Sequence, residues 1–244
     1  MAEAVSAVTS YVRRFGLVYV GLAVVAGAAV GATIVLAGRG DTRSPWSGWR
    51  PSAPAELRTK EIAAHVETAY RLENGTPLVS VVTGDPFESV VTQVATPPVG
   101  AGIGDQTTFY DASRTRMFVL CGAGKNCSLP GAATAERAEL LRREALELAL
   151  YTFKYVDAES VVEFLPGRAK ARPEFAFFFR RHELDRFLSE PLNATLTRKP
   201  PPLLPADVDP GEARRVDQLT LTHMFRFQLQ PSQAGGGLLV LDRG

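Results

Sequence analysis

The residues best suited to acid–base chemistry stand close together in the run HELDRF, which begins at His182. An imidazole and two carboxylates, those of Glu183 and Asp185, are groups that transfer protons in enzymes. With Arg142, they are the candidates for a hydrolase or transferase that acts on a cell-envelope substrate. Arg142 is far from the other three in the sequence, so only the convergence of all four side chains in a cleft would make them an active site.

No catalytic or cofactor-binding motif supports an enzyme. The three histidines, His65, His182 and His223, are far apart in the sequence and lack the paired spacing of an HExxH metal site. The chain has no GxSxG, no Walker loop and no dinucleotide fingerprint, since GAGIGD at 100–105 lacks the required glycine spacing. We therefore expect no metal and no cofactor, and we interpret the histidines as surface or structural residues.

The chain contains two cysteines, Cys121 and Cys127, in the run VLCGAGKNCSLPG. The glycines between them let the chain turn back on itself, and an exported domain permits oxidation, so we favour a structural disulfide. Two reduced or buried thiols are the alternative. Two cysteines are too few for a zinc site, and their spacing differs from the CxxC of redox enzymes.

A long helix is predicted over residues 135–156, with Thr134 as its N-cap. Its apolar arc is wide, and Arg142 projects into that arc, so its guanidinium must either extend to solvent or meet an acidic partner. The polar side is expected to hold Arg143, Glu144, Glu147 and Lys154. The pair Arg180–Arg181, at the end of a predicted strand, is either a solvated strand end or an anion site.

Residues 15–38, FGLVYVGLAVVAGAAVGATIVLAG, contain no charged residue and predict a transmembrane helix. A helix of this length extends roughly 36 Å, enough to cross a hydrocarbon core of about 30 Å. The run is too long for the apolar core of a cleaved signal peptide, which is the alternative. Ala23, Gly27 and Gly31 place a small residue at every fourth position, which would let two such helices associate closely.

The regions around this segment are a short tail, 1–14, and a linker, 39–54. Arginines directly before the apolar run favour a cytoplasmic N-terminus and an extracytoplasmic domain. In the linker, Trp46 and Trp49 could lie at the membrane interface or pack on the domain as its first ordered residues.

Residues 55–244 are expected to form one α+β domain. Helical spacing of apolar residues over 55–72 predicts an amphipathic helix, and strands are predicted at 77–83, 160–165 and 175–179. Two further strands, 107–112 and 115–120, are predicted to form a hairpin, and residues 219–230 and 238–241 a second one. The proline-rich run 199–210 is expected to cross the domain in an extended form. We thus predict a mostly antiparallel sheet covered by the helices at 55–72 and 135–156, after one N-terminal transmembrane helix.

Composition argues against some classes of function but does not identify one. Hydrophobic residues make up 45% of the chain and charged residues 22%, a globular balance once the anchor is set aside. After residue 50 the net charge is −2, which argues against nucleic-acid binding. We predict a bacterial, non-catalytic accessory or scaffold protein of the cell envelope. Its expected partners are the lipid bilayer and either another protein or a second copy bound through the transmembrane helix.

Overall fold

The computed structural model describes residues 45–72, 74–83, 90–97, 107–121, 132, 134–166, 173–197, 209–232 and 235–243. These residues belong to one compact unit, Pro45–Gly244. Within them, no helix combines the length and apolar character that crossing a bilayer requires. The predicted anchor and its small-residue stripe (Ala23, Gly27 and Gly31) lie outside the described residues, as does most of the proline-rich run 199–210.

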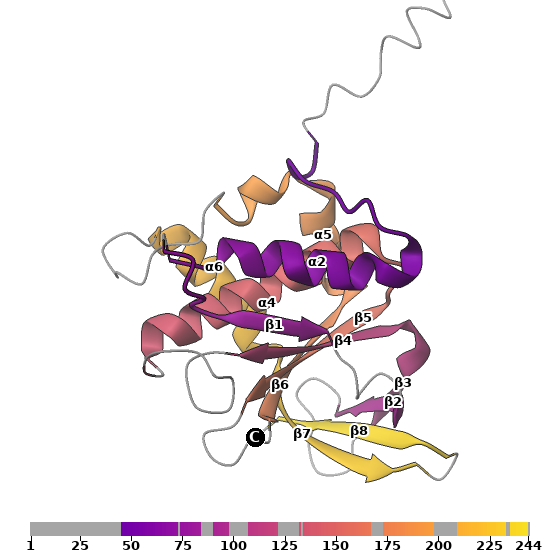
Figure 1. The fold of residues 1–244 in the computed structure, drawn as a ribbon. Helices are drawn as coiled ribbons and strands as arrows, with labels where there is room; N and C mark the ends of the chain where they lie inside the picture. Colours follow the sequence, from indigo (N-terminus) through magenta and orange to yellow (C-terminus); the bar gives the residue numbers. More distant parts are fainter. Residues whose placement is uncertain are drawn as a thin grey trace, which may run out of the picture. The chain divides into compact units, whose positions relative to one another are not determined.

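The described unit is a mixed α+β domain with an eight-stranded sheet and four α-helices (Figure 1). The helices lie together over one face of the sheet and are α2 (Ala55–Ala69), α4 (Ala135–Tyr155), α5 (Arg181–Ser189) and α6 (Pro210–Leu221). The strands are β1 (Ser80–Thr83), β2 (Val91–Thr96), β3 (Thr108–Asp111), β4 (Thr115–Cys121), β5 (Ser160–Pro166), β6 (Pro173–Arg180), β7 (Met224–Pro231) and β8 (Gly237–Asp242).

The strand order is β1-β4-β5-β6-β7-β8-β2-β3. Five of the seven neighbouring pairs are antiparallel, so the prediction of a mostly antiparallel sheet is confirmed. The parallel pair β4–β5 is joined through α4, the usual crossover for parallel neighbours. The second parallel pair, β2–β8, joins strands that lie far apart in the sequence.

The predicted hairpin of residues 107–112 and 115–120 is wrong. A single 3₁₀ turn, η1 (Ala112–Arg114), joins β3 to β4, and the Asp111 carboxylate begins it by accepting from the Ser113 N–H at 2.8 Å. The two strands then diverge: β3 pairs with β2 at one end of the sheet order, and β4 pairs with β1 and β5 near the other. The half-exposed β3 suits an edge, whereas the apolar β4 is buried on both faces.

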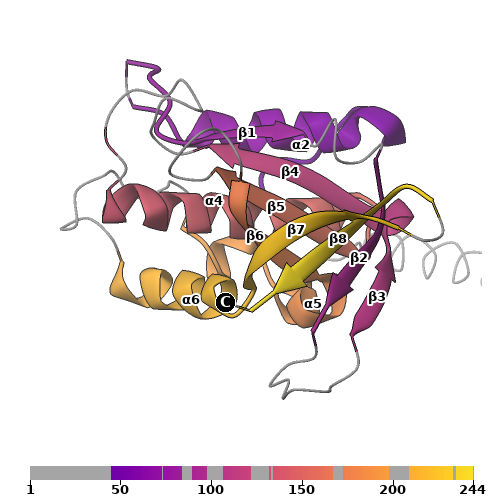
Figure 2. The ribbon, with the colours of Figure 1, turned by 90° about the horizontal axis from the view of Figure 1, so that it is seen from below.

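The sheet curls so that both of its faces bury apolar side chains. One core lies between the helices and the sheet and includes Phe153, Val161 and Phe179. The opposite face holds a second core, with Phe164 and Phe225, to which no described α-helix contributes. Strands β7, β8, β2 and β3 cross this face instead (Figure 2).

Trp46 and Trp49 pack on the domain, the second of the two alternatives for the linker. The Trp46 side chain is buried, and its indole N–H donates to the Phe187 carbonyl oxygen at 3.1 Å. The Trp49 ring stacks on His65 with 3.8 Å between ring centroids and 4° between planes. The compact unit of the domain therefore includes the part of the predicted linker from Pro45 onward.

The predicted polar side of the long helix is partly buried: α6 packs against Arg143, and Glu144 is buried too, whereas Lys154 is exposed as predicted. The strand predicted at 219–230 begins only at Met224, because the residues before it belong to the helix α6. Asp209 caps this helix, and its first residue is Pro210, a favoured position for proline. This helix carries Glu212 to Arg143, whose side chain is only 3% exposed. Arg143 donates to Glu212 at 2.6 Å, to the Tyr70 hydroxyl at 2.6 Å, and to the Thr197 carbonyl oxygen at 2.7 Å.

Two carboxyl groups are buried without such compensation. Glu144 on α4 and Glu163 on β5 have no exposed surface, and among the described residues none of their four side-chain oxygens has a hydrogen-bond partner. Burial raises the pKa of Glu163 well above its usual value, and the nearby Glu144 carboxyl raises it further. Both acids therefore favour the neutral form inside the fold.

Candidate functional site

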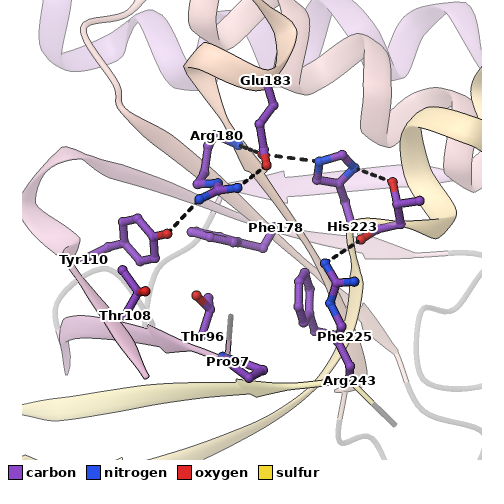
Figure 3. A pocket seen from close by; sticks show the side chains of 11 residues that line it. Thr96, Pro97, Thr108, Tyr110, Phe178, Arg180, Glu183, His223, Phe225 and Arg243 are labelled. Atoms are coloured by element: carbon purple, nitrogen blue, oxygen red, sulfur yellow. Dashed lines mark hydrogen bonds and ion pairs between the residues drawn. The ribbon is translucent and has the colours of Figure 1, made fainter. Parts of the chain in front are cut away.

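A partly open pocket of about 290 Å³ lies where β3 and β2 approach β6 and β7 (Figure 3). Two arginines, one carboxylate, one histidine, one proline, three aromatic rings and three threonines form its wall. The residues are Thr96, Pro97, Thr108, Tyr110, Phe178, Arg180, Glu183, Thr222, His223, Phe225 and Arg243.

Arg180 and Glu183 come together because β6 runs directly into α5. Arg180 is the N-cap of the helix, and the Glu183 carboxylate, three residues on, accepts from the Arg180 backbone N–H at 3.2 Å. The Arg180 guanidinium makes an ion pair with the same carboxylate. It also donates to the Tyr110 hydroxyl at 2.9 Å, across the gap between β6 and the edge strand β3.

His223 enters the site from the turn between α6 and β7. Its Nε2 lies 3.2 Å from Glu183 Oε2, and its Nδ1 lies 2.8 Å from the Leu219 carbonyl oxygen. Both oxygens are acceptors, so the ring matches both contacts when each nitrogen carries a proton. The hydroxyl of Thr222 is also 3.1 Å from Nδ1. In that form neither nitrogen has a free lone pair.

Electrostatics keep the Glu183 carboxylate ionised. Its partial burial alone would raise the pKa of this group, but hydrogen bonds from His223 and Arg180 outweigh that effect and lower the pKa to about 2. Glu183 therefore acts as a fixed negative charge that positions the Arg180 guanidinium and the His223 ring.

The pocket as a whole carries an excess of positive charge beside apolar walls. Arg180 and Arg243 oppose the single carboxylate of Glu183, and a protonated His223 would add another positive charge. The Arg243 guanidinium lies 5.3 Å from the ring centre of Phe225, and is exposed. An anionic group with an apolar part fits this combination, because the charge meets arginine donors and the remainder meets the rings.

Of the proposed catalytic residues, the structure brings only Glu183 into the pocket. His182 and Asp185 are exposed on α5. Arg142 is partly exposed on α4 and meets an acidic partner, Asp217, at 2.8 Å. Its neighbour Arg143 is buried instead, so Arg142 is not the charge that the core must compensate.

The cysteine pairing is not resolved by the described residues. Cys121 is the last residue of β4 and is partly buried, whereas Cys127 lies outside the described residues. The disulfide stays a prediction. Among the described residues, no group of three or more histidine, cysteine, aspartate or glutamate side chains is arranged to hold a metal ion.

Sequence interpretation missed most of this pocket. The anion-site hypothesis for Arg180–Arg181 stays a prediction: Arg180 lines the pocket, while Arg181 donates to backbone carbonyls, including Ala158 at 3.0 Å. The spacing of Arg180 and Glu183 is the one local signal. Tyr110 and His223 join them only through strand pairing.

Comparisons with known proteins give no match: no protein family, no curated protein and no solved structure is significantly similar to this chain. The argument for function therefore rests on the geometry of this pocket.

Proposed function

We propose that this protein is a single-pass membrane protein of the cell envelope whose domain binds an anionic partner near the membrane and catalyses no reaction. The apolar run 15–38 supports the anchor, and the arginines before it support a cytoplasmic N-terminus. The domain and a Cys121–Cys127 disulfide then lie on the extracytoplasmic side, and Gly27 and Gly31 offer a surface for self-association.

The observation that carries the binding function is the way in which Glu183 holds the Arg180 guanidinium and the His223 ring at the pocket wall. Arg180 uses part of its five N–H donors on Glu183 and Tyr110, which fixes the guanidinium while leaving further donors for a ligand. A group fixed in advance loses little conformational entropy when the ligand binds. The site is therefore prepared to bind an anion.

A hydrolase or transferase is the alternative, and one feature favours it. Thr222, His223 and Glu183 form a line of hydroxyl, imidazole and carboxylate groups, the order found in nucleophilic catalysis. The Leu219 carbonyl oxygen opposes this role, because at 2.8 Å it requires a proton on Nδ1. The Thr222 hydroxyl also donates to the Gln218 carbonyl oxygen at 3.2 Å, so it does not transfer its proton to His223.

Site-specific photocrosslinking in intact cells tests the binding function. A photoreactive residue at Thr108, an exposed position on the pocket wall, should capture a partner, and the exposed Glu56 on α2 serves as the matched position away from the pocket. The Thr108 adduct should disappear in Arg180→Met and weaken in Arg243→Ala, which removes an exposed guanidinium from the pocket wall. Equal adducts at both positions, or an adduct that ignores both arginines, would exclude this pocket as the binding site.

Turnover tests the alternative on the same preparation. We expect no hydrolysis of p-nitrophenyl acetate or p-nitrophenyl phosphate above the background rate. A hydrolysis rate that Thr222→Val abolishes would overturn the non-catalytic proposal and assign the hydroxyl as a nucleophile.

Thiol labelling of Cys121 and Cys127 in intact cells tests membrane placement. A membrane-impermeant reagent should label the protein only after reduction, which would support an external domain with a closed disulfide. Labelling without reduction, and only after the cells are opened, would place the domain in the cytoplasm and reverse the proposed orientation.

A further inference from the structure

The pocket lies beside an open edge of the sheet. Strand β3 is last in the strand order, and in the described part of the chain its one pairing partner is β2. In an edge strand, every second residue directs its backbone N–H and C=O away from the sheet, where another extended chain can pair with them.

Alternate residues of β3 line two different hollows. Thr108 and Tyr110 face the cationic pocket, opposite Thr96 and Val94 of β2. Phe109 and Asp111, on the other side of the strand, line a more open hollow together with Thr92, Gln93 and Gly235, and Tyr110 borders both hollows. An added strand would direct its own alternate side chains toward these two hollows, because the side chains of a strand alternate between faces.

The two hollows differ in chemistry. The inner pocket offers Arg180 and Arg243, which suit an acidic side chain. On the outer side, Phe109 is 58% exposed, the highest fraction among the exposed large hydrophobic residues that the structure describes, and it offers an apolar contact for a branched side chain. The pattern that matches both sides alternates acidic and apolar residues.

We propose that the partner is an extended acidic polypeptide segment that adds to β3 as a ninth strand, with a carboxylate in the Arg180–Arg243 pocket and an apolar side chain against Phe109. This inference rests on the proposed binding function and specifies its ligand. Backbone hydrogen bonds would supply affinity, and the two hollows would supply sequence preference.

The probe for this proposal is the peptide acetyl-Val-Glu-Val-Glu-Val-amide, measured by fluorescence anisotropy against the full-length chain in detergent. Valine favours extended structure, and the peptide presents glutamate on one side only. We expect saturable binding below about 1 mM. The lysine analogue, acetyl-Val-Lys-Val-Lys-Val-amide, should bind at least tenfold more weakly, because it brings positive charge to the arginines.

Arg243→Ala and Arg226→Ala form a matched pair of protein variants. Both arginines are exposed and lie over a phenylalanine ring, at 5.3 Å for Arg243 and 5.8 Å for Arg226, but only Arg243 lines the pocket. We expect Arg243→Ala to weaken peptide binding by about fivefold to tenfold, the effect of losing an exposed charge-assisted contact. Arg226→Ala should leave the affinity unchanged.

Backbone N-methylation of the peptide tests the strand geometry separately. Methyl groups on alternate peptide nitrogens remove the hydrogen bonds of one peptide edge, so one of the two alternate methylation patterns should weaken binding by at least about tenfold. If Arg243 dependence persists while neither pattern has an effect, strand addition is overturned and the anion pocket stands. Loss of Arg243 dependence, or no binding at about 1 mM, overturns the strand proposal as well as the assigned pocket.

Two other occupants would be recognised in the same assay. If glutarate displaces the peptide with equal affinity, the site takes a free dicarboxylate and the strand proposal fails. Dimerisation of the chain that Phe109→Ser abolishes would assign the edge to a second copy and also overturn the proposal.

Discussion

Replacing Arg143 by methionine should destabilise the domain more than any other single charge removal on α4. The Arg143 side chain is 3% exposed and neutralises two carboxylates, Glu212 at 6% exposure and Glu147 at 13%. Methionine fills a similar volume but leaves both acids without their counter-ion. Removing one partner of a buried ion pair costs about 3–5 kcal/mol.

The contacts that remain compensate little for the loss of the Arg143 charge, so we expect the full free-energy cost given above. Glu212 keeps one hydrogen bond, from the Thr197 N–H at 2.8 Å, and Glu147 keeps the Tyr70 hydroxyl at 2.7 Å. Neither contact supplies a positive charge. With a urea dependence of about 2–3 kcal/mol per molar, the unfolding midpoint should fall by about 1–2 M.

Urea unfolding of the full-length chain, followed by tryptophan fluorescence, measures this change. Both tryptophans report on α4, because Trp46 and Trp49 each contact the Tyr151 ring edge-on. Arg142→Met is the matched control: its ion pair with Asp217 is partly exposed, so its loss should cost about 0.2–1 kcal/mol. The reverse order of effects, or a cost below about 1 kcal/mol for Arg143→Met, would refute the buried network.

Two further predictions concern the buried carboxyl group of Glu163 and the backbone conformation at Gly236. Because the folded-state pKa of Glu163 is raised, the native state holds its proton longer than the unfolded chain, and stability should fall as pH rises above about 4.3. Glu163→Gln should flatten that fall and raise the melting temperature at pH 8, measured by thermal scans at pH 5 and 8; a wild-type melting temperature that rises over this interval contradicts the argument. Gly236→Ala should destabilise the domain by at least about 1–3 kcal/mol, since φ is +77° and the new Cβ would lie 2.4 Å from Thr92 Cγ2. Gly235→Ala, at φ +91° with no atom within 4 Å of the new Cβ, is the control and should cost less in urea unfolding.

The sequence predicted helices and strands well in segments where the apolar residues repeat with a single period. The helix at 135–156 and the strand at 160–165 match α4 and β5 closely, because their apolar residues repeat at the period of the element. The helix at 55–72 ends earlier, at Ala69.

The errors concern one element, the helix α6, and the partners of several side chains. In the sequence pattern, Arg143 lies on the polar side of its helix, and only the packing of α6 against it explains its burial. The helix α6 was not predicted because of the prolines that precede it. The pocket depends on pairs separated by 70 residues, Arg180 with Tyr110, and by 40 residues, Glu183 with His223. Such pairings follow from the topology of the sheet, which the spacing of apolar residues along the chain does not reveal.

The position of β2 and β3 in the strand order has a consequence for synthesis of the chain. They join the sheet through β8, whose residues are made well over a hundred positions later. While the ribosome is still adding those residues, β2 and β3 have no neighbouring strand to receive them, and contacts this distant in sequence form slowly. Although β2 and β3 are synthesised early, they therefore join the sheet late, and the candidate pocket that they border forms only after β8 is available.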